Sequence, residues 1–167
     1  MIKAIPDSNF LVAVFDERDS LAGKARPLWD ALSREGAEFF YLDCIVNEVI
    51  STLCRRFEER KRLEEWPEIF QTLKNFFTKD RLVWGYREVE RLYTGIIDLI
   101  GEHGGRLNFH DALIALLAKE QHIQYLISFD NDFDHISWLI RIGDIREIPG
   151  EQSGSDERLR NPGKDNE

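Results

Sequence analysis

Short apolar runs that suit β-strands alternate along this chain with longer segments in which apolar residues recur at helical spacing. The strand-like runs occupy residues 2–6, 38–42, 81–84, 124–129 and 138–148, and the helical periods occupy residues 20–35, 44–62, 66–77, 89–100 and 109–121. This alternation predicts an α/β domain with a mostly parallel central sheet between layers of helices. Ligands in such folds bind beyond the carboxyl ends of the strands.

The length and composition of the chain are those of one folded domain followed by a polar tail. The 167 residues are 43% hydrophobic and 32% charged, which is ordinary for a globular protein. We expect the domain to cover residues 1–149. Residues 150–167 are rich in Gly, Ser, Pro, Asn and charge, so we expect them to be a disordered C-terminal tail.

Several features indicate a cytoplasmic protein without a membrane partner. No apolar run approaches the roughly 20 residues that span a bilayer, and the first residues lack the apolar core of a signal peptide. Cys44 and Cys54 have the spacing of neither a zinc site nor a redox pair, and we expect both to be small buried hydrophobic residues. The net charge of −9 argues against avid nonspecific nucleic-acid binding but leaves a nuclease possible.

Four acidic residues stand where solvated charges are not expected: Asp7, Glu48, Asp111 and Asp130. Asp7 and Asp130 directly follow predicted strands, whereas Glu48 and Asp111 fall in the first turns of predicted helices. Strand ends and helix starts can face the same crevice in a parallel α/β fold. Ionised carboxylates near a core are costly, and a divalent cation is the commonest reason to gather several of them. The pattern therefore predicts a metal site.

Each acid also has a structural interpretation that the residues alone leave open. Asp7 could form a turn after its strand, Glu48 could face solvent, and Asp130 could be an ordinary loop residue. Asp111 could complete a capping box with Asn108 at the start of a helix. Only the four positions together favour a functional site.

The chain resembles the PIN-domain family, most of all the VapC-type toxin ribonucleases, over residues 2–148. The four matching pieces, in order, are Pro6-Asp7-Ser8-Asn9, Asn47-Glu48-Val49-Ile50, Asn108-Phe109-His110-Asp111-Ala112 and Ser128-Phe129-Asp130-Asn131-Asp132-Phe133. The resemblance implies a three-layer α/β/α PIN-like fold. It also implies a metal-dependent endoribonuclease that uses one or two Mg²⁺ or Mn²⁺ ions, which prefer oxygen ligands.

The resemblance assigns expected roles to the individual site residues. Asp7 and Asp111 are expected to bind a metal ion directly. Glu48 and Asp130 are expected to act through water or on a second ion. Supporting contacts are expected from Ser8, Asn9 and Ser128, and Asp132 is expected to be an auxiliary acid.

The same resemblance implies an RNA substrate, a cognate antitoxin protein and a homodimer. Two other functions remain open: an RNA-processing nuclease outside a toxin–antitoxin pair, and a non-catalytic PIN-fold module that binds RNA or acts as a scaffold. Acids at all four positions favour catalysis. A response-regulator receiver is disfavoured, because only Asp7 follows the first predicted strand and the last predicted strand contains no Lys.

Two further groups of residues have both a structural and a functional interpretation. The basic cluster Arg55, Arg56, Arg60, Lys61 and Arg62 is either a solvated helical face or a phosphate-contacting surface beside the metal site. The aromatic stripe Trp66, Phe70, Phe76 and Phe77 is either packing or part of a groove for an antitoxin helix. His110 is expected to be a packing or substrate-side residue.

Overall fold

The computed structural model describes residues 1–150, so the predicted tail lies, apart from Gly150, outside the described residues. Its centre is a parallel sheet in the order β2-β1-β5-β6. The strands are β1 (Lys3–Pro6), β2 (Glu38–Phe39), β5 (Tyr125–Ile127) and β6 (Ile140–Ile142). A second parallel pair joins β3 (Tyr41–Leu42) to β4 (Leu82–Val83). The predicted mostly parallel sheet is confirmed.

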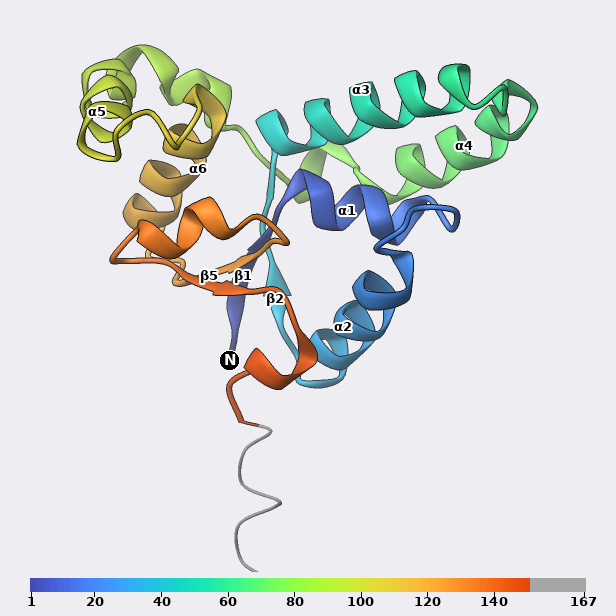
Figure 1. Cartoon of the computed structure of the whole chain (residues 1–167), viewed down its shortest axis with the longest axis horizontal. Coiled ribbons are helices and arrows are strands. Elements are labelled where there is room, and N and C mark those ends of the chain that lie inside the picture. Colours follow the sequence, from blue (N-terminus) through green and yellow to red (C-terminus); the bar gives the residue numbers. More distant parts are fainter. Residues whose placement is uncertain (151–167) are drawn as a thin grey trace, which may run out of the picture.

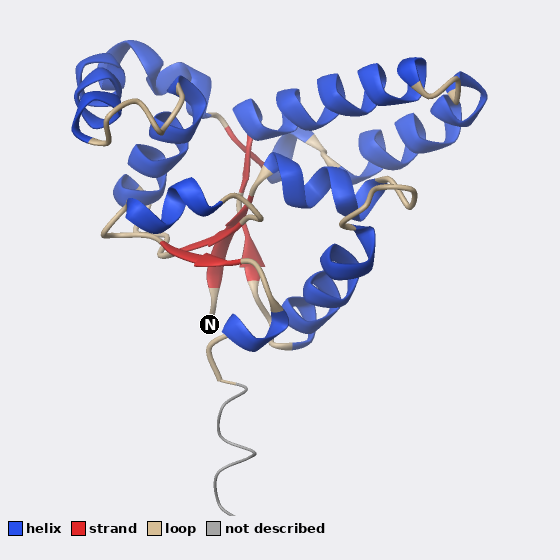
Figure 2. Cartoon of the chain, in the orientation of Figure 1, coloured by secondary structure: helices blue, strands red, loops and turns tan. Residues whose placement is uncertain are grey.

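Helices cover both faces of this sheet (Figures 1 and 2), as expected for a three-layer α/β/α domain. The α-helices are α1 (Ser8–Phe15), α2 (Ala22–Arg34), α3 (Asp43–Glu59), α4 (Trp66–Phe76), α5 (Val89–Glu102) and α6 (Phe109–Glu120). Short 3₁₀ turns are η1 (Leu63–Glu65), η2 (Lys79–Arg81), η3 (Gly85–Glu88), η4 (Asn131–His135) and η5 (Ile145–Glu147). Figure 1 shows α5 and α6 on one side of the sheet and α1 to α4 on the other.

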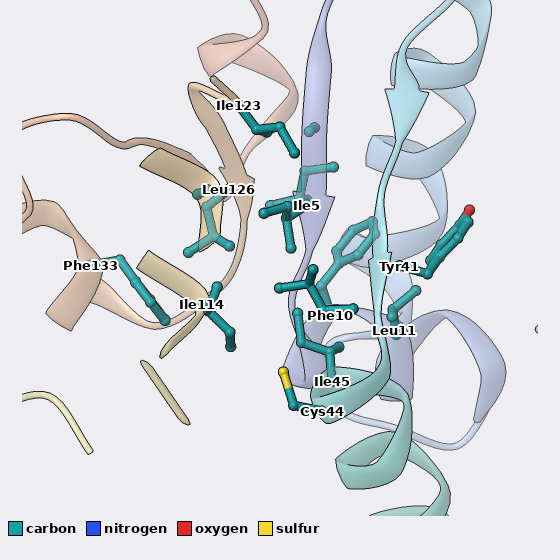
Figure 3. Close-up of a cluster of buried hydrophobic side chains, with 14 of the residues drawn as sticks. Ile5, Phe10, Leu11, Tyr41, Cys44, Ile45, Ile114, Ile123, Leu126 and Phe133 are labelled. Carbon is teal, nitrogen blue, oxygen red and sulfur yellow. The ribbon is translucent and has the colours of Figure 1, made fainter. Parts of the chain in front are cut away.

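The core lies between the sheet and both helical layers. Figure 3 shows Ile5 of β1 and Leu126 of β5 beside Ile114 of α6, with Phe10 of α1 and Ile45 of α3 close by. These five side chains are at most 2% exposed. Burial of apolar side chains from both layers fixes the sheet between them and so holds the ends of its strands in place.

The register of the two central strands places their carboxyl ends at the same level. Pro6 pairs with Ile127, and the next N–H, that of Asp7, donates to the Ile127 carbonyl at 2.9 Å. Asp7 and Ser128 therefore lie side by side, although they are 121 positions apart in the chain.

Three local expectations need correction. Residues 8–15, to which the sequence analysis assigned no helix or strand, form α1. Four consecutive residues from Phe10 to Ala13 are buried, so this helix has no apolar stripe at helical spacing. Residues 38–42 divide into β2 and β3, which belong to different sheets. Of the predicted last strand, only Ile140–Ile142 forms a strand, and Asp144 and Glu147 form a capping box that starts η5.

The expected burial of both cysteines holds for Cys44 but is wrong for Cys54, which is exposed. Ten residues along an α-helix correspond to about 1000°, which places the two side chains about 80° apart around the helix axis. This offset is enough to move Cys54 from the buried stripe of α3 to its exposed flank.

Candidate active site

Asp7 stands at the junction of β1 and α1, where it is the N-cap of the helix. Its carboxylate is held by three donors: Oδ1 accepts the N–H of Ser8 at 2.7 Å, while Oδ2 accepts the Ser128 hydroxyl at 2.7 Å and the Asn9 amide at 2.9 Å. The residue is only 5% exposed. Asp7 is therefore a buried carboxylate with a fixed orientation. Ser8, one of the expected supporting residues, contacts this carboxylate through its backbone N–H.

The electrostatic surroundings of Asp7 disfavour its ionised form. Burial raises the pKa of Asp7 to about 6, and the hydrogen bond from Ser128 opposes this rise without cancelling it. The negative charges of Glu48 and Asp111 raise the pKa of Asp7 further. The three acids predicted from separate parts of the sequence thus interact electrostatically in the folded protein.

A polar network extends from Asp7 to the end of β5. The Asn9 amide donates to Ser128 Oγ at 3.1 Å, and its oxygen accepts the N–H of Phe129 at 3.1 Å. Ser128 Oγ in turn accepts the N–H of Asp130 at 3.0 Å. Asp130 Oδ1 accepts the N–H of Asp132 at 2.9 Å and so begins η4. The expected supporting residues Asn9 and Ser128 therefore connect two of the site acids.

Asp111 has the capping role that the sequence left open. Asn108 Oδ1 accepts the N–H of Asp111 at 3.0 Å, and Asp111 Oδ2 accepts the N–H of Asn108 at 2.9 Å. Burial nevertheless raises the pKa of Asp111, and the charges of Asp130, Glu48 and Asp132 raise it further. The capping box orients Asp111 without removing it from the acidic cluster.

Glu48 is the exposed member of the cluster. It lies on the second turn of α3, and its carboxylate has no hydrogen bond or ion pair with any residue of the described range 1–150. Its charge raises the pKa of both Asp7 and Asp111, which indicates that it faces the space next to both. Its carboxylate is therefore free to turn toward a ligand.

The kind of residue at this site fits Mg²⁺ or Mn²⁺, although the side chains are not in a closed ligand arrangement. Across residues 1–150, no group of three or more His, Cys, Asp or Glu side chains is placed to hold a metal ion. However, an all-carboxylate set suits a hard cation, and the raised pKa values of Asp7 and Asp111 mark negative charge that a cation would compensate. Binding of one ion by three of these side chains would therefore require them to move closer together.

Asp43 is an organising residue that the sequence analysis missed. Its carboxylate is 8% exposed, and Oδ1 accepts the N–H groups of Cys44 at 2.8 Å, Gly85 at 2.9 Å and Tyr86 at 3.2 Å. These hydrogen bonds of Asp43 therefore link η3 to the start of α3. Its position between Leu42 and Cys44 is the same signal, an acid set among apolar residues, that singled out the other four.

The basic cluster stabilises the far end of α3. Arg62 is 7% exposed and donates to Asp16 at 2.9 Å and to Glu65 at 2.9 Å, and Arg56 pairs with Asp19. Arg60 lies 3.7 Å from Asp16. Figure 1 places this end of α3 away from the end that carries Glu48. The solvated-face interpretation is therefore wrong for Arg62, and the phosphate-contact interpretation does not fit the position of the cluster.

The aromatic stripe contributes mainly to packing. Phe76 and Phe77 contact the rings of Phe15 and Tyr41 with centroid separations of 5.2–5.6 Å. Trp66 packs edge-on against Phe57, and Phe70, which is 47% exposed, lies against Trp66. Phe70 is thus the member of the stripe that faces solvent.

The fold and the site define an α/β domain with a cluster of carboxylates at the carboxyl edge of a parallel sheet. The model of the PIN domain family matches residues 4–139, and the chain belongs to this family. A comparison with curated proteins gives no match.

Among solved structures, the chain is similar to VapC20 of Mycobacterium tuberculosis, a toxin that cleaves the sarcin-ricin loop. The two share 18% sequence identity with a TM-score of 0.59, over 81% of this chain and 96% of VapC20. This likeness confirms the PIN-like fold. No helix within residues 1–150 has the length and apolar character needed to cross a membrane.

Proposed function

We propose that this protein is a metal-dependent endoribonuclease that hydrolyses phosphodiester bonds of RNA. The observation that carries the proposal is the buried, fully hydrogen-bonded Asp7 carboxylate, whose pKa is raised toward neutrality by burial and by the facing acids Glu48 and Asp111. A protein that needed Asp7 only as a helix cap would have no use for the other two acids beside it. Perturbed carboxylates gathered at a strand edge are typical of an active site.

In this proposal each acid has a distinct part. Asp7 and Asp111 hold Mg²⁺ or Mn²⁺ directly, while Glu48 and Asp130 hold it through water or hold a second ion. Asn9 and Ser128 keep the Asp7 carboxylate oriented through hydrogen bonds of 2.9 and 2.7 Å, and Ser8 adds its backbone N–H. The bound metal would polarise the phosphoryl oxygen and lower the pKa of the attacking water. Asp132 adds negative charge next to Asp111.

We further propose that the protein is the toxin of a type II toxin–antitoxin pair, that it is a cytoplasmic homodimer, and that a cognate antitoxin neutralises it. Support comes from membership of the PIN family and from the similarity in fold to VapC20, a toxin that cleaves the sarcin-ricin loop. An RNA-processing nuclease of the same fold is the main alternative. A non-catalytic module is disfavoured, because all four acids are present and Glu48 has no structural partner among residues 1–150.

The test of the nuclease is cleavage of a mixed pool of structured RNA by the purified protein with Mn²⁺, with Mg²⁺ and with EDTA. Asp7→Asn is expected to lose at least roughly a hundredfold in rate, in line with removal of a group that stabilises the reacting charge. The matched control is Asp30→Asn, which changes an exposed acid of α2 and is expected to cut normally. Cleavage that persists in EDTA, or equal rates in the two variants, would overturn the proposal.

The toxin hypothesis is tested separately by inducing the chain in a bacterial host. Wild-type protein is expected to arrest growth, whereas Asp7→Asn expressed at the same level is expected to be harmless. Active nuclease in the test tube with no effect on growth would favour the RNA-processing alternative.

A further inference from the structure

The 3₁₀ turn η3 lies between the two helices that carry Glu48 and Asp111. It begins two positions after the last residue of β4 and contacts α3, α5 and α6. Asp43 at the start of α3 accepts the backbone N–H groups of Gly85 and Tyr86 with Oδ1, and its Oδ2 lies 3.2 Å from the Tyr86 nitrogen. A buried carboxylate thus fixes the backbone of Tyr86 beside the acidic site.

Gly85 allows this turn to approach α6 closely. A Cβ atom at Gly85 would lie 2.5 Å from Cδ1 of Leu117 and 3.3 Å from Oδ1 of Asp43. Leu117 is buried in α6, so it has little room to move away. The position of the next residue, Tyr86, is therefore determined from both sides.

The ring of Tyr86 is held in place yet remains 42% exposed. Its hydroxyl lies 3.4 Å from Nδ2 of Asn47 and 3.3 Å from Nε2 of His110, which are the chain neighbours of Glu48 and Asp111. The rings of Tyr86 and His110 meet nearly edge-on, at 6.1 Å between centroids and 70° between planes. Tyr86 is thus a partly exposed aromatic residue whose hydroxyl contacts the chain neighbours of two of the acids.

The charge distribution of the protein favours RNA binding through an exposed aromatic ring at this place. The basic side chains Arg56, Arg60 and Arg62 are engaged with acids at the far end of α3. The chain as a whole carries a net charge of −9, so phosphate contacts alone offer little affinity for RNA. Stacking of unpaired bases on aromatic rings supplies affinity without positive charge.

We propose that the ring of Tyr86 is a stacking surface for an unpaired nucleobase adjoining the phosphate to be cleaved. This inference rests on the proposed ribonuclease function and adds a substrate-contacting residue to it. The ligand is a nucleotide in a single-stranded segment or loop, because a base that is stacked within a duplex cannot present its face to a side chain. Asp43 and Gly85 act as positioning residues for the ring.

The alternative role for Tyr86 is a clasp that joins α3 to α6 through its hydroxyl. Tyr86→Phe distinguishes the two roles, because it removes both hydroxyl contacts and keeps the ring. For a stacking surface, Tyr86→Phe is expected to keep KM within about twofold of wild type. Tyr86→Ala is expected to raise KM roughly 5- to 150-fold, the range that corresponds to about 1–3 kcal/mol of stacking per base.

The experiment measures cleavage and binding of a short unpaired RNA oligonucleotide of mixed sequence. The kcat and KM values are measured for wild type, Tyr86→Ala, Tyr86→Phe and the control Phe70→Ala, which removes an exposed aromatic ring on α4. Binding is measured in the cleavage-deficient Asp7→Asn background, with the intact oligonucleotide and with one that has an abasic position beside the cleaved phosphate. Thermal unfolding checks that each variant is folded.

Among the variants, Tyr86→Ala alone is expected to have a raised KM. The protein that retains Tyr86 should bind the abasic RNA more weakly than the intact RNA. In Tyr86→Ala, the abasic position should cause no further loss of affinity. Two outcomes overturn the stacking surface while the ribonuclease stands: Tyr86→Ala cleaves like wild type, or Tyr86→Phe is as defective as Tyr86→Ala. If wild-type protein neither binds nor cleaves RNA, both the ribonuclease and the stacking surface are overturned.

Discussion

The hydroxyl of Ser128 donates a hydrogen bond of 2.7 Å to Oδ2 of Asp7, and this contact joins the ends of two neighbouring parallel strands. Ser128 is fully buried, and the same oxygen accepts the N–H of Asp130 at 3.0 Å. One side chain therefore connects the first and the last of the four site acids.

Ser128→Ala is expected to weaken the site and the fold together. Removing the hydroxyl takes one of three donors from the Asp7 carboxylate and leaves the Asp130 N–H without its acceptor, which should lower the free energy of unfolding by about 1–3 kcal/mol. Because the Ser128 hydrogen bond lowers the pKa of Asp7, that pKa should rise further in the variant. Urea unfolding and a pH titration of metal binding measure the two effects. Ser33→Ala, an exposed change on α2, is the control, and an equal stability for both variants would contradict the expectation.

The raised pKa of Asp7 predicts an unusual pH dependence of stability in metal-free protein. The folded-state pKa of about 6 lies above the ordinary value of 3.8, so the folded state binds more protons than the unfolded state between these two values. The contribution of Asp7 to stability is therefore lost as pH rises through that window, by about 3 kcal/mol in total. Urea unfolding in EDTA between pH values of about 4 and 7 should show this fall relative to Asp7→Asn. A constant difference between the two proteins across the window would contradict it.

Glu48→Gln is expected to change stability and activity in opposite directions. Removing its charge should lower the pKa of Asp7 and of Asp111, since Glu48 raises both. Metal-free protein should then gain roughly 0.5 kcal/mol of stability near neutral pH, as for relief of a repulsion at a partly solvated site. In the proposed mechanism Glu48 binds the metal ion, so RNA cleavage should fall by roughly tenfold or more. A variant that loses both stability and activity would instead indicate a structural role for Glu48.

Asp16→Ala tests the ion pairs at the other end of α3. Asp16 is 1% exposed and pairs with the buried guanidinium of Arg62, so its removal leaves a buried cation with Glu65 as its partner. The expected loss in stability is roughly 3 kcal/mol. The metal dependence of RNA cleavage should be unchanged below the melting temperature, because these residues lie away from the acids. A selective loss of cleavage with normal unfolding would show that this cluster does contact the substrate.

Much of the site was predictable because parallel α/β folds gather strand ends and helix starts at one edge. The positions of Asp7 and Asp130 directly after strand-like runs indicated that both would lie at this edge, and the paired ends of β1 and β5 agree with it. Asp111 shows a limit of such reasoning. Its sequence context supports a capping box equally well, and in the structure it has both the cap and the acidic neighbours.

The features that the sequence analysis missed depend on contacts between distant residues. The pair of Asp16 and Arg62 spans 46 positions, so no local spacing indicates it, and each residue taken alone suits a solvated loop or helix face. Helix α1 was missed because it is buried on most sides and has no apolar stripe. The contacts of Asp43 with Gly85 and Tyr86 depend on how β3 pairs with β4, which is set by the tertiary structure.

The most direct test of the metal site is calorimetric titration of Mn²⁺ into the RNA-free protein, for wild type, Asp7→Asn and the control Asp30→Asn. We expect saturable binding of one or two ions to wild type and to Asp30→Asn. Asp7→Asn should bind at least roughly tenfold more weakly. Absence of binding to wild type, or equal binding by all three proteins, would contradict the claim that Asp7 and its neighbouring acids form a metal-dependent active site.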